Sequence, residues 1–270
     1  MTAFFDRLAG RIEEIDSIVS VGLDPDEDRL PAEVRDADLP RWEFNRRIID
    51  ATHEHAAVFK PNAAFYEDSD GWRTLEQTVE HAHEKGVPVL LDAKRADIGN
   101  TSRQYARVLD SVDAITLNPF LGRDALAPFL DREGAGCFLL CRTSNPGGAD
   151  VQELELASGE LVYERVADLA SEWSRAGNQN IGLVVGATTP EELRSVRERV
   201  PDLPFLVPGV GAQGGDAEAA ATYATADASG AGLVNSTRSI IFAGEDSDCD
   251  FDEAAAEAAR DLKARLNRYR

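Results

Sequence analysis

The chain alternates between short apolar runs and longer amphipathic stretches from one end to the other. Short apolar runs bounded by turn residues are typical of buried strands, and a helical period of apolar residues indicates a helix packed on a core. The eight repeats favour a closed (β/α)₈ TIM barrel of the α/β class, with residues 1–270 forming one domain. The predicted strands are 18–23, 57–60, 87–92, 114–117, 137–141, 182–185, 205–207 and 232–234, and the predicted helices lie near 42–54, 72–85, 101–110, 123–131, 159–176, 190–199, 215–224 and 252–268.

Polar or Gly/Pro-rich segments follow the predicted strands. In a TIM barrel the carboxyl ends of all strands meet at one mouth, and active sites form there. A polar residue at a position that a core would fill with Val or Leu is therefore a candidate for chemistry. The segments are GLDPD, FKPNAAFYE, LDAKRADIGNTS, LNPFLG, CRTSNPGG, VGATTPEE, VPGVGAQGG and NSTRS.

The densest of these signals is the segment Asp92-Ala93-Lys94-Arg95-Ala96-Asp97 at the end of the third strand. On an extended chain Asp92 and Lys94 point to the same side, toward the barrel mouth. Lys60 ends the second strand and is expected beside them. Charges that alternate in this way keep each other ionised. An array of Lys60, Asp92, Lys94 and Asp97 can keep an ammonium group protonated, so that it serves as an acid, and can place a carboxylate against a substrate anion. The alternative is a surface ion-pair cluster, in which DxKxxD spacing also occurs.

The chain is strongly acidic, with 49 Asp and Glu residues, 28 Lys and Arg residues and a formal net charge of −21. This balance argues against nucleic acid or an anionic membrane as a general partner. Four of the basic residues are lysines, Lys60, Lys85, Lys94 and Lys263. We interpret this composition as adaptation to a salty cytoplasm, where a carboxylate shell keeps the protein hydrated. A GC-rich genome that favours arginine codons is the alternative.

Three cysteines without a CxxC pair suit a reducing compartment. The first residues, MTAFFDRLAGRIEE, carry charge throughout and lack the apolar region of a signal peptide. No apolar run approaches the length that spans a membrane. The sequence therefore predicts a cytoplasmic protein that does not act at a membrane.

Six segments, in order, resemble the longer subfamily of the orotidine 5′-phosphate decarboxylase family: SVGLDPD, FKPNAAFYE, LDAKRADIGNTS, RTSNPG, VPGVGAQGG and NSTRSIIFA. The resemblance covers residues 4–243. It implies a dimeric (β/α)₈ enzyme that converts orotidine 5′-monophosphate to UMP and CO₂, the last step of de novo pyrimidine synthesis, without a metal or organic cofactor. Ala96 stands where the commoner motif has glycine, a small departure.

The resemblance also assigns roles to the charged residues. Lys94 is implied to protonate C6 of the pyrimidine, with Asp92 against the departing carboxylate. Lys60 and Asp24 are implied to bind the ribose hydroxyls and orient the array. Three further residues match those that reach into the neighbouring subunit's site, so that the dimer is needed for catalysis: Asp97, Ile98 and Thr101.

The later strands are implied to hold the rest of the substrate. Ser144 matches the residue that hydrogen-bonds the amide edge of the pyrimidine. Arg238 offers a bidentate fork to phosphate oxygens. The loop from Pro208 to Gly215 is implied to fold over the substrate, with Gln213 on the phosphate, and backbone N–H groups near Thr237 and Gly209 add donors. Asn118 and Arg142 lie at strand ends without an assigned role.

Three other interpretations of the sequence compete with this one. Residues 209–214 also satisfy GxGxxG, but a dinucleotide fingerprint belongs to the first βα turn of an open sheet. Because this motif follows the seventh predicted strand, the preferred interpretation is that it binds a phosphate group. A related barrel that acts on a sugar phosphate would share DxKxxD and would hold Mg²⁺ with an additional acidic residue. A non-catalytic phosphate-binding barrel has no reason to keep a buried proton donor beside Asp92.

Overall fold

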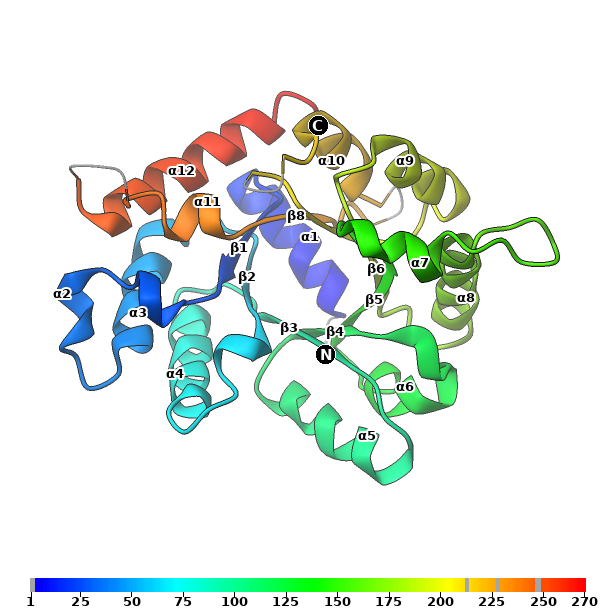
Figure 1. The fold of residues 1–270 in the computed structure, drawn as a ribbon, viewed down its shortest axis with the longest axis horizontal. Helices are drawn as coiled ribbons and strands as arrows, with labels where there is room; N and C mark the ends of the chain where they lie inside the picture. The colour runs from blue at the N-terminus through cyan, green and yellow to red at the C-terminus, as the bar shows by residue number, and fades with distance from the viewer. Residues whose placement is uncertain (1–2, 212–213, 227–228, 246–248) are drawn as a thin grey trace.

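The computed structural model describes residues 3–211, 214–226, 229–245 and 249–270, and it confirms the predicted barrel (Figure 1). Its strands are parallel and hydrogen-bonded in the order β2-β1-β8-β7-β6-β5-β4-β3. Parallel bridges from Phe59 to Val89 and from Asn62 to Asp92 join β2 to β3 and close the ring. The strands are β1 (Val19–Leu23), β2 (Val58–Pro61), β3 (Leu90–Arg95), β4 (Ala114–Leu117), β5 (Gly136–Arg142), β6 (Ile181–Val185), β7 (Phe205–Pro208) and β8 (Leu233–Ser236).

A ring of helices surrounds the strands, and eight of them lie where the amphipathic pattern predicts helices: α3 (Pro40–Thr52), α4 (Gly71–Glu84), α5 (Gly99–Tyr105), α6 (Arg123–Leu130), α8 (Val162–Ala176), α9 (Pro190–Arg199), α10 (Ala217–Ala224) and α12 (Phe251–Leu266). Additional short helices decorate the strand ends: α2 (Ala32–Arg35), α7 (Ala149–Gln152), α11 (Arg238–Ile241) and the 3₁₀ turns η1 (Glu27–Arg29), η2 (Ala63–Phe65), η3 (Ala106–Asp110), η4 (Pro119–Leu121) and η5 (Pro146–Gly148). Within the described ranges, none of the helices has the length and apolar character needed to cross a membrane.

Helix α1 (Phe4–Ile15) precedes the first strand and was missing from the predicted elements. It buries Phe4, Phe5, Leu8 and Ile12, which recur at helical spacing. The ring of Phe5 packs edge-on against Phe138 of β5, with centroids 5.5 Å apart. A side chain at Gly136, the first residue of β5, would collide with Phe4. Helix α1 therefore covers the amino-terminal end of the barrel, which leaves the opposite end as the accessible mouth.

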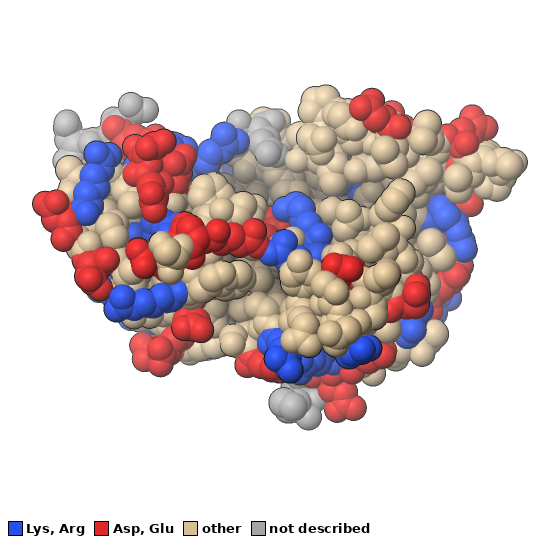
Figure 2. Space-filling view, turned by 60° about the horizontal axis from the view of Figure 1, so that its bottom comes forward, with Lys and Arg blue, Asp and Glu red and all other residues tan. Residues whose placement is uncertain are grey.

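Acidic side chains are spread over the molecular surface, with basic ones lying among them (Figure 2). Several arginines tie neighbouring helices together through these carboxylates. Arg47 of α3 contacts Asp252 of α12 at 2.8 Å, and Arg199 of α9 contacts Asp168 of α8 at 2.6 Å. Because Asp and Glu outnumber Lys and Arg by 21, the protein keeps a large excess of negative charge even where such ion pairs form.

Unfolding of the protein is expected to become harder as KCl is added. At molar salt the Debye length falls to about 3 Å, which screens repulsion among the excess carboxylates. A gain of about 2 kcal/mol would raise the unfolding midpoint by roughly 4–8 °C in a chain of this size. Thermal unfolding followed by circular dichroism in 0.1 M and in molar KCl measures this shift. Maximal stability in dilute buffer would contradict salt adaptation.

Candidate active site

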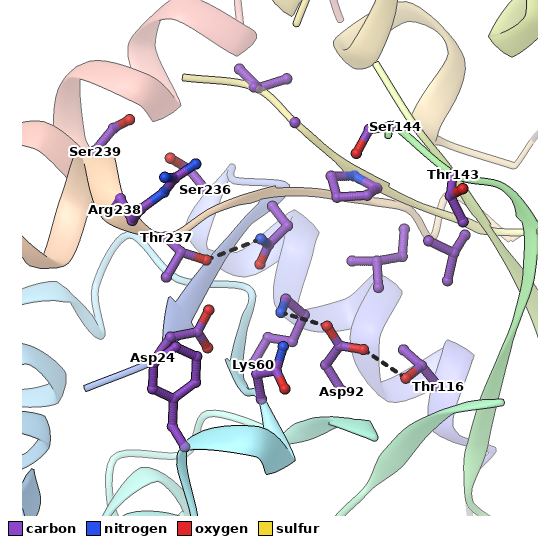
Figure 3. A pocket seen from close by; sticks show the side chains of 18 of the residues that line it. Asp24, Lys60, Asp92, Thr116, Thr143, Ser144, Ser236, Thr237, Arg238 and Ser239 are labelled. Atoms are coloured by element: carbon purple, nitrogen blue, oxygen red, sulfur yellow. Dashed lines mark hydrogen bonds and ion pairs between the residues drawn. The ribbon is translucent and has the colours of Figure 1, made fainter. Parts of the chain in front are cut away.

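A cavity of about 520 Å³ opens at the carboxyl ends of the strands. All eight strands, or the segments directly after them, contribute to its wall, so the lining brings together residues that are far apart in the sequence (Figure 3). Asp24, Lys60 and Asp92 lie on one side, Arg238 lies at one end and Ser144 at the other. Leu140, Val184 and Leu206 supply apolar lining. The cavity has room for a nucleotide-sized molecule, with charged groups and apolar surface at different places.

Three members of the predicted charged array, Lys60, Asp92 and Lys94, lie together at the centre of this wall. The fourth, Asp97, is not among the described residues that line it. The Nζ atom of Lys60 lies 3.2 Å from Oδ2 of Asp92, and the Nζ atom of Lys94 lies 2.6 Å from Oδ1. Lys60 is almost fully buried, whereas the Lys94 side chain is 48% exposed toward the cavity mouth. Two ammonium groups therefore share one carboxylate, and the more accessible of them faces the space where a ligand binds.

Burial and charge act in opposite directions on these groups. Burial alone would raise the pKa of Asp92, but Lys60, Lys94 and the hydrogen bonds to Lys94 and Thr116 outweigh it and lower that pKa to about 2. Burial would lower the pKa of Lys60, and the neighbouring Asp92 and Asp24 outweigh it and raise that pKa. Both groups are consequently ionised at neutral pH.

Asp24 follows β1 and differs from Asp92 in its surroundings. Burial raises the pKa of Asp24, with Lys60 opposing the rise. Its Oδ1 atom is buried and has no hydrogen-bond partner among the described residues. A buried carboxylate oxygen without a partner is costly, so a ligand hydroxyl that donates to it would be bound favourably.

The backbone around Lys94 differs from the extended strand that the sequence argument assumed. Leu91 pairs with Ile115 and Arg95 pairs with Leu117, so three residues of β3, 92–94, face the single residue Thr116 of β4. Within this bulge Lys94 has a left-handed backbone with φ of 49°. Such a conformation costs a non-glycine residue roughly 1 kcal/mol or more and is typical of functional sites. Asp92 and Lys94 are still brought together, but by the bulge rather than by strand alternation.

Ser144 lines the far end of the cavity, between Thr143 and Asn145, as the sequence predicted. A side chain at Gly186 would collide with the backbone of Ser144, so the loop after β6 packs closely against it. Gln152 of α7 fixes the neighbouring residue, because its Oε1 accepts from the Thr143 N–H and its Nε2 donates to the Thr143 hydroxyl, each at 2.9 Å.

The two residues without an assigned role have structural ones. The nearly buried guanidinium of Arg142 contacts Glu153 and Glu192 and donates to the Thr143 carbonyl oxygen at 3.0 Å, so it braces the loop that carries Ser144. The side chain of Asn118 accepts from the N–H of Phe120 at 3.1 Å and caps the turn η4.

The other end of the cavity is formed after β7 and β8. Pro208, Gly209, Thr237 and Arg238 all line it, as predicted. A side chain at Gly22 would overlap the Thr237 hydroxyl, so glycine is required there for the two strand ends to pack. Gln213 lies outside the described residues.

Asn235 was missed by the sequence argument and lies beside this end. Its Nδ2 donates to the Thr237 hydroxyl at 3.3 Å, while its Oδ1 accepts from the buried Ser20 of β1 at 3.0 Å. The sequence does carry a signal for Asn235 as a candidate site residue, since it places a polar side chain at a strand position that is normally apolar in a barrel core.

Asp97, Ile98 and Thr101 are not part of the cavity wall, as far as the described residues define it. Asp97 accepts from the backbone N–H of Ile98 at 2.7 Å, and the Ile98 side chain is exposed. Phe120 is 83% exposed on the next βα connection, after β4. These residues therefore lie on an exposed surface that includes apolar side chains, outside the site of their own chain.

The barrel, with charged residues gathered at the carboxyl ends of its strands, defines a class of protein, the (β/α)₈-barrel enzymes. The sequence model described as the Orotidine 5'-phosphate decarboxylase / HUMPS family matches residues 17–248, and the chain belongs to this family. At the level of whole chains it is 69% identical to the orotidine 5'-phosphate decarboxylase of Halorubrum lacusprofundi, over 99% of this chain and 100% of that protein. It is 67% identical to the protein of the same name from Haloarcula marismortui, over 99% of each chain.

Solved structures agree with the fold. The structure of Leishmania donovani OMP decarboxylase superposes with a TM-score of 0.82 at 36% identity, over 99% of this chain and 98% of that one. The relatives from Halorubrum, Haloarcula and Halobacterium come from halophilic archaea, which agrees with the salt adaptation inferred from the composition.

Proposed function

We propose that this protein converts orotidine 5′-monophosphate to UMP and CO₂, the last step of de novo pyrimidine synthesis. The observation that carries the proposal is the array in which Asp92 lies between Lys60 and Lys94, set in the wall of a nucleotide-sized cavity. Family membership and the names of the most similar relatives support the same reaction.

The array fits the chemistry of this decarboxylation. Loss of CO₂ leaves an electron pair on C6 of the ring, in an orbital that does not delocalise into the π system. The ammonium of Lys94 stabilises that charge as it develops and then supplies the proton that completes UMP. Because Asp92, itself paired with Lys60, already holds the Lys94 ammonium in place, little reorganisation accompanies the reaction.

The two ends of the cavity fit the two ends of the nucleotide. Arg238 and the backbone near Thr237 bind the phosphate, in agreement with the phosphate sites found after strands seven and eight of many TIM barrels. Pro208 and Gly209 complete this end, and the family resemblance assigns Gln213, which lies outside the described residues, to the phosphate. The ribose hydroxyls bind Lys60 and Asp24, whose buried Oδ1 atom has no hydrogen-bond partner within the described part of the chain. The pyrimidine lies at the Ser144 end, against the apolar lining.

We further propose that the enzyme is a homodimer in which Asp97, Ile98 and Thr101 of each chain complete the partner's site. Ile98 itself and Phe120, on the next βα connection, are exposed apolar residues, which supports burial of this surface against a second copy. The buried cysteines Cys137 and Cys141 are free thiols, which supports a place in the reducing cytoplasm.

The decisive experiment is to add the purified protein to orotidine 5′-monophosphate and to follow the loss of substrate absorbance. We expect turnover that is unchanged by EDTA, because the proposed chemistry uses protein ammonium and carboxylate groups without a metal or organic cofactor. The same assay tests the sugar-phosphate alternative. Activity that EDTA abolishes and Mg²⁺ restores would favour that alternative, and a lack of turnover would refute the proposal.

A further inference from the structure

Thr116 occupies a special place in the bulge of β3. Three residues of β3 face this one residue of β4, so the regular ladder between the two strands is interrupted where Lys94 lies. A buried backbone N–H needs a partner, and an interrupted ladder does not supply one. The Thr116 hydroxyl supplies it, because its Oγ1 accepts from the Lys94 N–H at 2.9 Å.

The same hydroxyl also contacts the carboxylate of the array. Thr116 Oγ1 donates to Oδ1 of Asp92 at 2.8 Å (Figure 3). The same oxygen accepts from the Lys94 ammonium at 2.6 Å. The threonine side chain is buried. A hydroxyl has one hydrogen to donate, and here the chain itself uses that hydrogen. Thr116 lines the cavity wall, but its one hydroxyl hydrogen goes to Asp92, so it has none to donate to a ligand.

We propose that Thr116 is a positioning residue for the reaction. Its hydroxyl holds the left-handed backbone of Lys94 and one oxygen of Asp92, so that the Lys94 ammonium and the Asp92 carboxylate face the substrate in a fixed geometry. The proposal rests on the decarboxylase function proposed above. Two features favour threonine at this position. Its β-branched side chain suits the strand, and its hydroxyl replaces the backbone partner that the bulge removes.

The test replaces Thr116 by valine, which keeps the shape and removes the hydroxyl. In Thr116→Val, kcat is expected to fall about 10- to 100-fold, the range for losing a hydrogen bond to a charged group. The Kd for UMP, which lacks the departing carboxylate, is expected to stay within about twofold of wild type, because the phosphate and ring ends of the cavity are intact. Thr116→Ser keeps the hydroxyl and is expected to recover most of kcat.

Hydrogen exchange supplies a readout that does not depend on turnover. The Lys94 amide is expected to exchange faster in Thr116→Val than in wild type or Thr116→Ser, because it loses its acceptor. The matched control is Thr52→Val. Thr52 is also buried, its hydroxyl donates to the Ile48 carbonyl oxygen at 2.6 Å on α3, and it lies outside the cavity wall. This variant is expected to keep wild-type kcat.

The proposal is overturned by a wild-type kcat in Thr116→Val, by a serine variant as impaired as the valine variant, or by unchanged exchange at the Lys94 amide. A parallel loss of UMP affinity would also overturn it, since that result indicates a general structural role. If Thr116→Val does not fold, Thr116→Ala takes its place in the same measurements. Wild-type protein without turnover would refute the decarboxylase function itself, which distinguishes the two failures.

Discussion

Lys94→Ala is expected to abolish decarboxylation while UMP still binds. The substitution removes both the charge that stabilises the C6 carbanion and the proton that completes the product. Fixed electrostatic groups and general acids each contribute about two to four orders of magnitude, so kcat is expected to fall by at least about 10⁴-fold. Rate measurements with orotidine 5′-monophosphate and titration calorimetry with UMP separate the two effects.

A second lysine provides the control for this variant. Lys85 follows α4 and pairs with Asp50 at 2.7 Å, and it is not part of the cavity wall. Lys85→Ala changes the net charge by the same amount as Lys94→Ala and is expected to keep wild-type kcat. Wild-type turnover in Lys94→Ala would remove this residue from the role of proton donor. If Lys94→Ala loses both UMP binding and turnover, the result would indicate a damaged cavity instead.

Mixing Lys94→Ala chains with Asp97→Ala chains is expected to restore activity that neither variant has alone. If Asp97 acts in the partner's site, a mixed dimer has one site with both substitutions and one site with neither. Random exchange of equal amounts makes half of the dimers mixed, which gives about a quarter of the wild-type specific activity. The measurement is the decarboxylation rate after subunit exchange, with exchange verified by native mass spectrometry of a mass-tagged chain.

The control for the mixing experiment pairs Lys94→Ala with Asp92→Asn. Both substitutions then lie in the part of the site that a single chain supplies, so each site of a mixed dimer carries one of them. No recovery is expected from this mixture. Two results would contradict the proposed sharing of Asp97 between subunits. One is equal recovery of activity in both mixtures, and the other is no recovery in the mixture of Lys94→Ala with Asp97→Ala after verified exchange.

The sequence was most informative where a local pattern reports directly on structure. The spacing of apolar residues predicted the eight strands, and the structure has each of them, although β3 begins three residues later than the predicted segment and ends at Arg95. Polar residues at strand ends predicted the mouth of the barrel, because parallel strands deliver their carboxyl ends to one place. Lys60, Asp92 and Lys94 were thereby expected together, and they are.

Contacts between strands that are adjacent in space were harder to predict. Thr116 was overlooked because its role depends on a register shift between β3 and β4 that no local pattern encodes. Arg142 remained without a role because its partners, Glu153 and Glu192, lie in other loops. Helix α1 is not among the predicted elements, although its apolar residues have helical spacing. It precedes the first strand and so lies outside the strand–helix alternation that predicts the barrel.

The sequence by itself determined the barrel, the acidic surface and the identity of the charged residues at the strand ends, because periodicity and composition are properties of the chain. The tertiary structure decided how those residues act on each other. The left-handed backbone of Lys94 and the burial of Lys60 arise from packing between strands distant in sequence. The same packing leaves one oxygen of Asp24 without a hydrogen-bond partner among the residues that the structure describes. Hydrogen bonding and desolvation depend on distances of a few ångströms, and those distances are fixed when the barrel closes.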